Sequence, residues 1–226
     1  MLTAKKNFTE GITSAKSLFT IYDYLLNSIH LPHEDITDLL RAQIVYSISA
    51  LDRFIHELVR IGTLEIFEYK RIATQKFNVQ QFKGQTILNI KKFLETQPIP
   101  TSPDELPSVI INKEIIEKLS FLSFQAPDKI KDALSLIWNE QNKLTILAKQ
   151  MGLPGNNDND KKQLLEQTLL LIATRRNQII HEADIDSTTG KRRVIDRDNV
   201  EDSINFIENL GYAIYDVVIS PNCYIK

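Results

Sequence analysis

The sequence predicts an all-α fold, an up-and-down bundle of five to seven helices. Apolar residues recur at spacings of three and four along most of the chain, which is the helical period. Seven glycines and eight prolines in 226 residues are too few for a turn-rich all-β protein. Hydrophobic residues make up 42% of the chain, enough to form a core without disulfides or metal. We therefore expect residues 1–226 to form a single helical domain.

Two long helices are predicted first, over residues 5–29 and 35–69. Asp35, followed by Asp38, is interpreted as the N-terminal cap of the second. That helix would extend about 50 Å at the usual rise per residue, long enough to be the spine of the bundle. The predicted apolar faces consist of Phe8, Ile12, Ala15, Phe19, Tyr22 and Leu26 in the first helix, and of Leu40, Ile44, Ile48, Leu51, Ile55 and Leu58 in the second.

Residues 70–112 are less regular and are interpreted as an insertion or hinge. Within them we expect a short helix over 84–97 and an extended loop over 97–107, where four prolines interrupt the pattern. Further helices are predicted over 113–124, over 127–150 with Pro127 in the first turn, over 161–182, and from 198 to about 219. The capping-box pattern marks the start of each of the last two predicted helices, as Asp160 with Gln163 and as Asp198 with Glu201.

The charge balance excludes binding to nucleic acid through bulk charge. Lys and Arg number 27 against 29 Asp and Glu, a net charge of −2. Residues 174–197 have the opposite sign, with six cations against four carboxylates. A rim that binds phosphates and a solvated loop both fit this charge. The candidate RNA-binding cations are Arg175, Lys191, Arg192 and Arg193.

A single cysteine, Cys223, excludes a disulfide framework and a cysteine-rich zinc site. His30 and His33 flank Pro32, but no further ligands are suggested nearby, so no metal site is expected. The N-terminus lacks the apolar segment of a signal peptide, and no run of 18 apolar residues could span a membrane. We expect a cytoplasmic protein without a membrane partner.

The predicted helix 161–182 breaks its own pattern. Leu165, Leu169 and Ile172 form an inward stripe, and the same spacing then reaches Arg176. An arginine on a core-facing stripe is costly unless it is paired or faces a wet cleft. Asn177 and His181 are four residues apart, so their side chains share a face and the amide can orient the imidazole. Arg176 and His181 are about 140° apart around the helix axis, so they flank a groove from two sides.

These residue types suit RNA cleavage by the RNA's own 2′-hydroxyl. Histidine titrates near neutral pH and can act as the general acid or the general base. Arginine binds two phosphate oxygens and keeps its proton, so it can stabilise the charge of a phosphorane. This chemistry requires neither a metal nor a cofactor. The alternative is that Arg176 and His181 merely cap and pair a helix end, where a histidine gains from the helix dipole.

The segment Arg176-Asn177-Gln178-Ile179-Ile180-His181 resembles the R-x4-H signature of HEPN domains. The following Glu182-Ala183-Asp184 and the upstream run 49–57 are also similar to members of that superfamily. The resemblance implies a helical bundle that dimerises and, in many members, a metal-independent endoribonuclease whose two motifs face each other across the dimer cleft. It makes Arg176 and His181 catalytic, with Asn177 orienting His181. Prokaryotic members often act as toxins or in phage defence, which implies an antitoxin or a defence-system partner.

The sequence also fits functions other than RNA cleavage. Other HEPN members are inactive scaffolds that bind a protein or nucleic acid, and a plain helical adaptor would have no affinity for nucleic acid. Asp52 and His56 are four apart on the long helix, and they fit a second-shell or catalytic pair, a buried structural hydrogen bond, or a surface pair. Trp138 is expected in the core or at a dimer interface.

Overall fold

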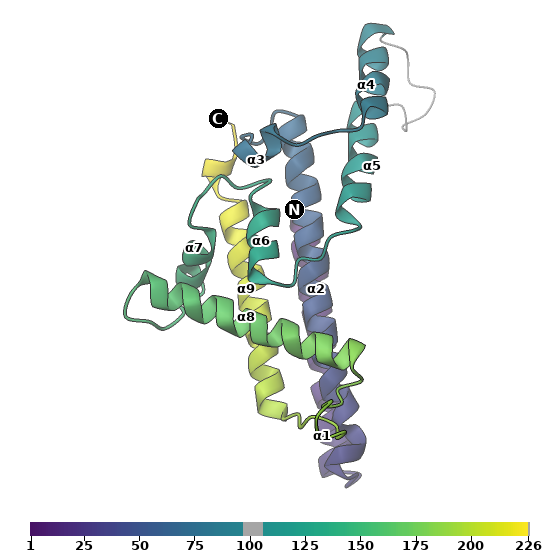
Figure 1. The fold of residues 1–226 in the computed structure, drawn as a ribbon, viewed down its shortest axis with the longest axis vertical. Coiled ribbons are helices and arrows are strands. Elements are labelled where there is room, and N and C mark those ends of the chain that lie inside the picture. Colours follow the sequence, from purple (N-terminus) through teal and green to yellow (C-terminus); the bar gives the residue numbers. More distant parts are fainter. Residues whose placement is uncertain (97–105, 226) are drawn as a thin grey trace.

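The computed structural model describes residues 1–96 and 106–225. These residues form nine α-helices, one short 3₁₀ helix and two isolated β-bridges, without a β-strand (Figure 1). The predicted all-α fold is confirmed. None of the helices in the described ranges combines the length and apolar character that crossing a membrane requires.

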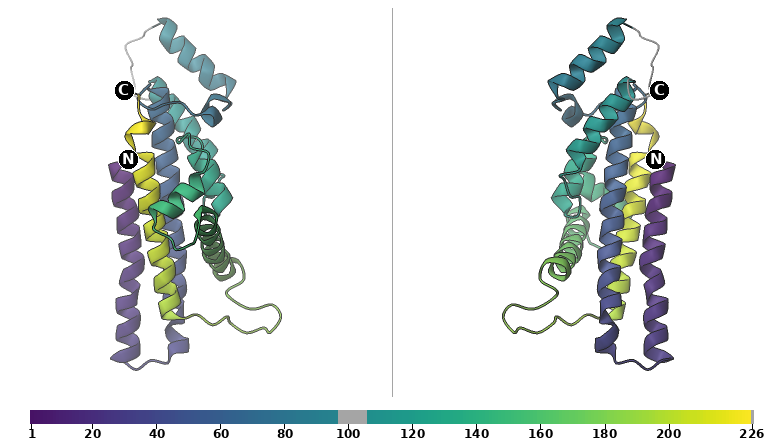
Figure 2. Two further views of the ribbon diagram at one scale, coloured as in Figure 1. Left: turned by 90° about the vertical axis from the view of Figure 1, so that its left-hand side faces the viewer. Right: turned by 90° about the vertical axis from the view of Figure 1, so that its right-hand side faces the viewer.

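Three long helices lie side by side and form the body of the molecule (Figure 2): α1 (Leu2–Asn27), α2 (His33–Phe67) and α9 (Arg197–Val218). Their packed faces are the predicted ones, because the two N-terminal stripes are buried apart from the partly buried Leu26. The stripe of α9 is buried as well, and it consists of Val200, Ile204, Ile207, Gly211, Ile214 and Val218.

Helix α8 (Asp158–His181) lies crosswise to α2 and α9, as both figures show. Its buried residues are Leu165, Leu169, Ile172 and Ala173, all in the first two thirds of the helix. The last two turns extend to the side of the bundle, and residues 182–196 return from there to the start of α9. This crossing places the end of α8 at the surface.

The single helix predicted over 127–150 is wrong. The structure has α6 (Pro127–Leu134) and α7 (Lys143–Gln150), separated by residues 135–142. Backbone carbonyls in the break accept side-chain hydrogen bonds instead of continuing a helix: Arg71 donates to Ile137 at 3.1 Å, and Thr74 donates to Leu136 at 3.1 Å. The apolar side chains that suggested one helix are all buried: Ile130, Leu134, Ile137, Leu144 and Leu147. One apolar pattern therefore covers two helices and the break between them. Pro127 lies in the first turn of α6, as expected.

The predicted insertion over 70–112 forms α3 (Gln75–Asn78), α4 (Gly84–Thr96) and the start of α5 (Pro107–Leu119). Figure 1 shows α4 above α5 at one end of the molecule, and the two helices are in contact. Buried Glu114 of α5 holds this pair together by accepting the backbone N–H of Lys83 at 2.8 Å. The extended loop predicted over 97–107 lies almost entirely outside the described residues.

The predicted N-terminal caps are displaced by two to three residues. Helix α2 starts after Pro32, so Asp35 lies inside its first turn. In α8 the cap is Asn157, whose side chain accepts from two backbone N–H groups, and in α9 it is Asp196. In each case the sequence pattern selected an acidic residue two or three positions after the observed cap.

Candidate functional site

The three residues of the R-x4-H segment lie on the last turns of α8. Asn177 and His181 are exposed, and Arg176 is half-buried between the packed face of the helix and the surface. His181 is the last residue of the helix, and its ring has no hydrogen-bond partner within the described ranges. The structure thus places an exposed imidazole and a partly buried guanidinium on the last two turns of the same helix.

Arg176 is not satisfied by the protein. Its Nε is buried and has no hydrogen-bond partner among residues 1–96 and 106–225, while its Nη1 donates to Asn177 Oδ1 at 3.1 Å. A buried donor without an acceptor costs about 1–3 kcal/mol. Such a group calls for an explanation, and an anion that binds at the guanidinium would provide one.

Asn177 has a different neighbour from the one expected. Its side-chain oxygen accepts from Arg176, and the described residues show no hydrogen bond between Asn177 and His181. The amide nitrogen of Asn177 stays free to donate. In this structure Asn177 therefore orients the guanidinium rather than the imidazole.

The helix ends at His181 because the next turn is left-handed. Ala183 and Asp184 have φ angles of 50° and 58°, a region that residues with a Cβ rarely adopt. The backbone N–H of Glu182 and that of Asp184 both donate to the carbonyl of Gln178, at 3.1 and 3.0 Å. Strained non-glycine turns persist only when the surroundings impose them, so this turn needs an anchor.

That anchor is a buried ion network that sequence reasoning missed. The carboxylate of Asp184 is fully buried and accepts from Arg41 Nε at 2.6 Å and from Arg175 Nη2 at 2.9 Å. Arg41 and Arg175 also donate to the carbonyls of Arg193 and Val194, at 2.8 and 3.1 Å. The network joins α2, α8 and the segment that follows α8.

One sequence signal could have revealed the network. Arg41 lies on the same stripe as Thr37, Ile44 and Ile48, so a cation interrupts the buried face of α2. It is the same kind of interruption that singled out Arg176. Burial lowers the pKa of Arg175, although the neighbouring Asp184 acts in the opposite direction. Its guanidinium keeps its charge and is held in one orientation.

The other candidate cations are mostly engaged by carboxylates. Arg193 contacts Glu182 at 2.8 Å and donates to the carbonyl of Ile185, and Arg192 forms an ion pair with Asp38. Lys191 is exposed, and its ammonium group has no partner among the described residues. The positive balance predicted from the sequence is therefore largely neutralised, and Arg176 and Lys191 are its least engaged members.

A groove runs along the end of α8 on the side of the helix that does not carry Arg176. It has a volume of about 460 Å³ and lies between α8, the start of α9 and the segment that joins them. Leu171, Thr174, Arg175 and Gln178 line it from α8. Gln178 and His181 are three residues apart, so they are neighbours on the helix surface.

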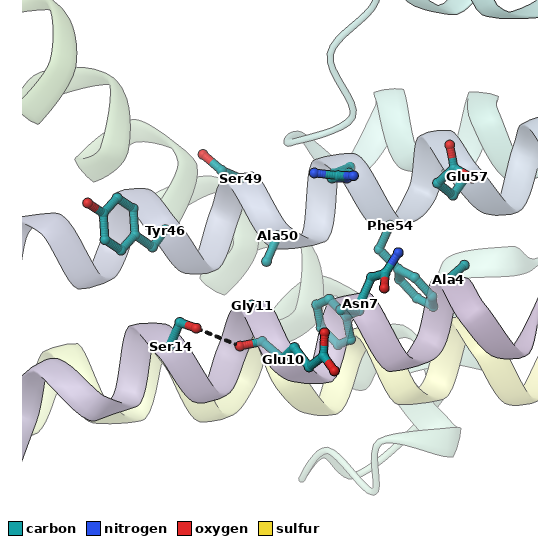
Figure 3. A pocket seen from close by; sticks show the side chains of 12 residues that line it. Ala4, Asn7, Glu10, Gly11, Ser14, Tyr46, Ser49, Ala50, Phe54 and Glu57 are labelled. Atoms are coloured by element: carbon teal, nitrogen blue, oxygen red, sulfur yellow. Dashed lines mark hydrogen bonds between the residues drawn. The ribbon is translucent and has the colours of Figure 1, made fainter.

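A hollow of similar size, about 480 Å³, lies between α1 and α2 far along the sequence from the motif (Figure 3). Gly11 and Ala50 form its floor, where a Cβ on Gly11 would come within 2.9 Å of that of Ala50. Its carboxylates, Glu10 and Glu57, form ion pairs with Lys6 and Arg60. Because it contains no histidine and its acids are paired, it is a weaker candidate for proton transfer than the end of α8.

Asp52 and His56 serve a structural contact. Asp52 Oδ1 accepts the backbone N–H of Phe124, and His56 hydrogen-bonds to the carbonyls of Asp52 and Leu119 at 2.8 and 3.1 Å. They attach the segment after α5 to α2, and no contact with Arg176 or His181 is present in the described part. Trp138 is buried, as expected for a core residue.

The remaining histidines form no metal site. His33 Nδ1 hydrogen-bonds to the hydroxyl of Tyr22 at 2.6 Å, and His30 is exposed with a φ of 60°. Within the described ranges, no group of three or more His, Cys, Asp or Glu side chains is arranged to hold a metal ion.

Comparison with known proteins places the chain in a family. No curated protein and no solved structure matches it. A family model described as RiboL-PSP-HEPN matches residues 11–220, which include all of α2, α8 and α9. Because this match covers nearly the whole length, the chain belongs to the HEPN family.

Proposed function

We propose that the protein is a metal-independent endoribonuclease that cleaves RNA by attack of the 2′-hydroxyl on the adjacent phosphate. Membership of the HEPN family supports an RNase-like or nucleotide-binding function. The observation that carries the finer proposal is the half-buried Arg176, whose unpaired Nε lies on the same helix end as the exposed His181.

In this reaction Arg176 binds the non-bridging oxygens of the scissile phosphate. When the guanidinium turns outward to bind, its orphan N–H gains an acceptor, and the interaction strengthens as negative charge accumulates in the phosphorane. His181 transfers the proton, and Asn177 keeps the guanidinium in place through the 3.1 Å hydrogen bond. The products are a 2′,3′-cyclic phosphate and a 5′-hydroxyl.

The reaction needs a base for the 2′-hydroxyl and an acid for the leaving oxygen, and the motif supplies one histidine per chain. A homodimer that brings two α8 ends together supplies both. Exposed apolar side chains on α8 outside the groove fit such a contact: Leu170 is 55% exposed and Ile180 43%. Leu170 precedes Asn177 by two turns on the same stripe, so a contact there would bring the two motifs near each other.

The test compares RNA cleavage by the wild type, Arg176→Ala and His181→Ala in the presence of a chelator. We expect each substitution to reduce the cleavage rate at least about 100-fold, because general acid–base and charge-stabilising groups each contribute at least that much. Circular dichroism checks that both variants fold, and Gln167→Ala, an exposed change on the same helix, is the control. Full activity in both variants, or complete loss upon chelation in the wild type, would refute the mechanism.

A non-catalytic dimeric scaffold is the second candidate. The engagement of Arg175, Arg192 and Arg193 by carboxylates favours it, because fewer cations are left to bind a phosphate backbone. A dimer that binds RNA at low salt and never cuts it would support the scaffold.

The biological role we propose is that of a toxin or phage-defence effector, held in check by an antitoxin or another component of a defence system. Induced expression should then stop bacterial growth, and expression of His181→Ala should not. Growth arrest by both proteins would separate the toxicity from the proposed chemistry.

A further inference from the structure

The groove beside the motif has the composition of a site for a flat, partly polar ring. Apolar walls come from Leu171, Ile172 and Val194, and Leu171 and Val194 are 70% and 91% exposed. Its volume of about 460 Å³ falls in the lower part of the range of small-ligand sites, roughly 300–1,000 Å³. It therefore has room for one nucleobase.

Two side-chain amides in the groove are unused. Within the described residues, neither the Gln178 nor the Asn199 side chain has a hydrogen-bond partner, although both residues line the groove. Two neighbouring polar side chains are already engaged: Asp196 caps α9 by accepting from the Asn199 N–H at 3.0 Å, and Ser203 donates to the Asn199 carbonyl at 2.7 Å. An amide presents a donor next to an acceptor, the pattern found on base edges.

The wall that carries Arg175 is held rigidly. Asp184 and the carbonyl of Val194 fix its guanidinium, whose side chain is still 20% exposed. Proteins stack single-stranded bases on guanidinium planes and read them with side-chain hydrogen bonds.

The position of the groove links it to the motif. Thr174, Gln178 and His181 follow each other at spacings of four and three, so they form one stripe along α8. The first two line the groove and the third is the proposed proton-transfer residue. A base in the groove would thus lie within one helical turn of His181.

We propose that this groove is a base-binding subsite that selects the nucleotide next to the scissile phosphate, with Gln178 and Asn199 reading its edge. The inference rests on the proposed ribonuclease function. Adenine is the expected base, because a side-chain amide pairs with its N6 and N7 groups through two hydrogen bonds.

The experiment uses 2′-O-methyl RNA oligonucleotides with a single cleavable ribonucleotide, so that the cut position is fixed while the flanking base is varied among A, C, G and U. We expect kcat/KM to be highest for adenine. Gln178→Ala and Asn199→Ala should each reduce it about three- to ten-fold for adenine, and little for the other bases, as expected for one lost hydrogen bond. Gln167→Ala and Asn209→Ala make the same chemical changes at exposed positions of α8 and α9 outside the groove.

Binding of the fully 2′-O-methylated oligonucleotides, measured by fluorescence anisotropy, tests the base-binding subsite separately from the ribonuclease activity. Base-selective binding that Gln178→Ala abolishes, without any cleavage by the wild type, would leave the subsite standing and refute the nuclease. Cleavage at equal rates for all four bases, or a base preference that survives both groove substitutions, would refute the subsite and leave the nuclease. A change of oligomeric state in Gln178→Ala, seen by light scattering, would identify the groove as a contact between protomers and also refute the subsite.

Discussion

Asp184 determines the geometry at the end of α8 more than any residue of the motif itself. Its carboxylate lies between two guanidiniums, and its backbone adopts a φ of 58°. A buried carboxylate and a left-handed backbone each cost free energy on their own, and here each compensates for the other. The left-handed turn brings the carboxylate to Arg41 and Arg175, and their attraction offsets the strain of the turn.

Asp184→Ala should lower the free energy of unfolding by about 3–5 kcal/mol, because it leaves the buried Arg41 and the half-buried Arg175 without the buried carboxylate that lies between them. Urea denaturation followed by circular dichroism measures the change. Glu182→Ala, which removes an exposed partner of Arg193, should cost less than about 1 kcal/mol. Equal effects of the two substitutions would show that the network contributes no more than a surface ion pair.

The packing of α1 against α9 depends on a glycine. A Cβ at Gly211 would lie 2.3 Å from two ring carbons of Phe8. That ring cannot move aside easily, since it stacks on Phe54 with centroids 4.7 Å apart and meets the edge of Tyr212 at 6.0 Å. The close approach of the two helices thus needs a residue without a side chain at this position.

Gly211→Ala is expected to destabilise the protein by about 1–3 kcal/mol through overpacking, despite the gain of roughly 1 kcal/mol in helix propensity. Gly84→Ala is the matched control, because no atom lies within 4 Å of its Cβ position and its φ is not left-handed. It should be neutral or slightly stabilising. Thermal unfolding of both variants gives the comparison, and a stabilised Gly211→Ala would mean that Phe8 has room to shift.

Among the described residues, α8 lies across the bundle formed by α1, α2 and α9, and this arrangement exposes the end of α8. Leu170 and Ile180 are exposed on α8 outside the groove, although a helix that packs on a core usually turns such residues inward. Two-fold pairing is the commonest outcome for a soluble homo-oligomer and uses one patch twice. The proposed dimer would cover these side chains and complete the site.

Leu170→Glu is therefore expected to weaken self-association at least ten-fold, because two carboxylates would meet across the two-fold axis, and to reduce RNA cleavage in parallel. Sedimentation velocity over a concentration series measures the association. Leu88→Glu, an equally drastic change at an exposed position of α4, should alter neither property. A Leu170→Glu protein that sediments like the wild type would place any dimer contact elsewhere.

Helical periodicity predicted which residues are buried far better than where helices start and stop. The stripes of α1, α2 and α9 depend on local spacing alone, and burial follows wherever a helix meets a core. The break after Leu134 depends on Arg71 and Thr74, which reach the carbonyls of residues more than 60 positions away. The spacing of apolar residues within one segment cannot reveal that distant side chains will take the hydrogen bonds of its backbone carbonyls.

The candidate site shows the same division. Arg176, Asn177 and His181 were singled out because a guanidinium interrupts an apolar stripe, which is a local property of one helix. The groove combines α8 with α9, and the roles of Arg41 and Asp184 depend on residues 143 positions apart. The sequence likewise did not show which carboxylates pair with Arg192 and Arg193. The local positive charge counted from the sequence therefore overstated the number of cations that are free to bind phosphate.

The amino-acid sequence by itself determined the helical class, the buried faces and the arginine–histidine pair, because each of these follows from the spacing of residues within a single helix. Only the tertiary structure decided how α8 crosses the bundle, which carboxylates take the surrounding cations, and which side chains form the groove. These features arise from contacts between distant segments, and the energies of such contacts depend on burial and geometry that exist only once the chain has folded.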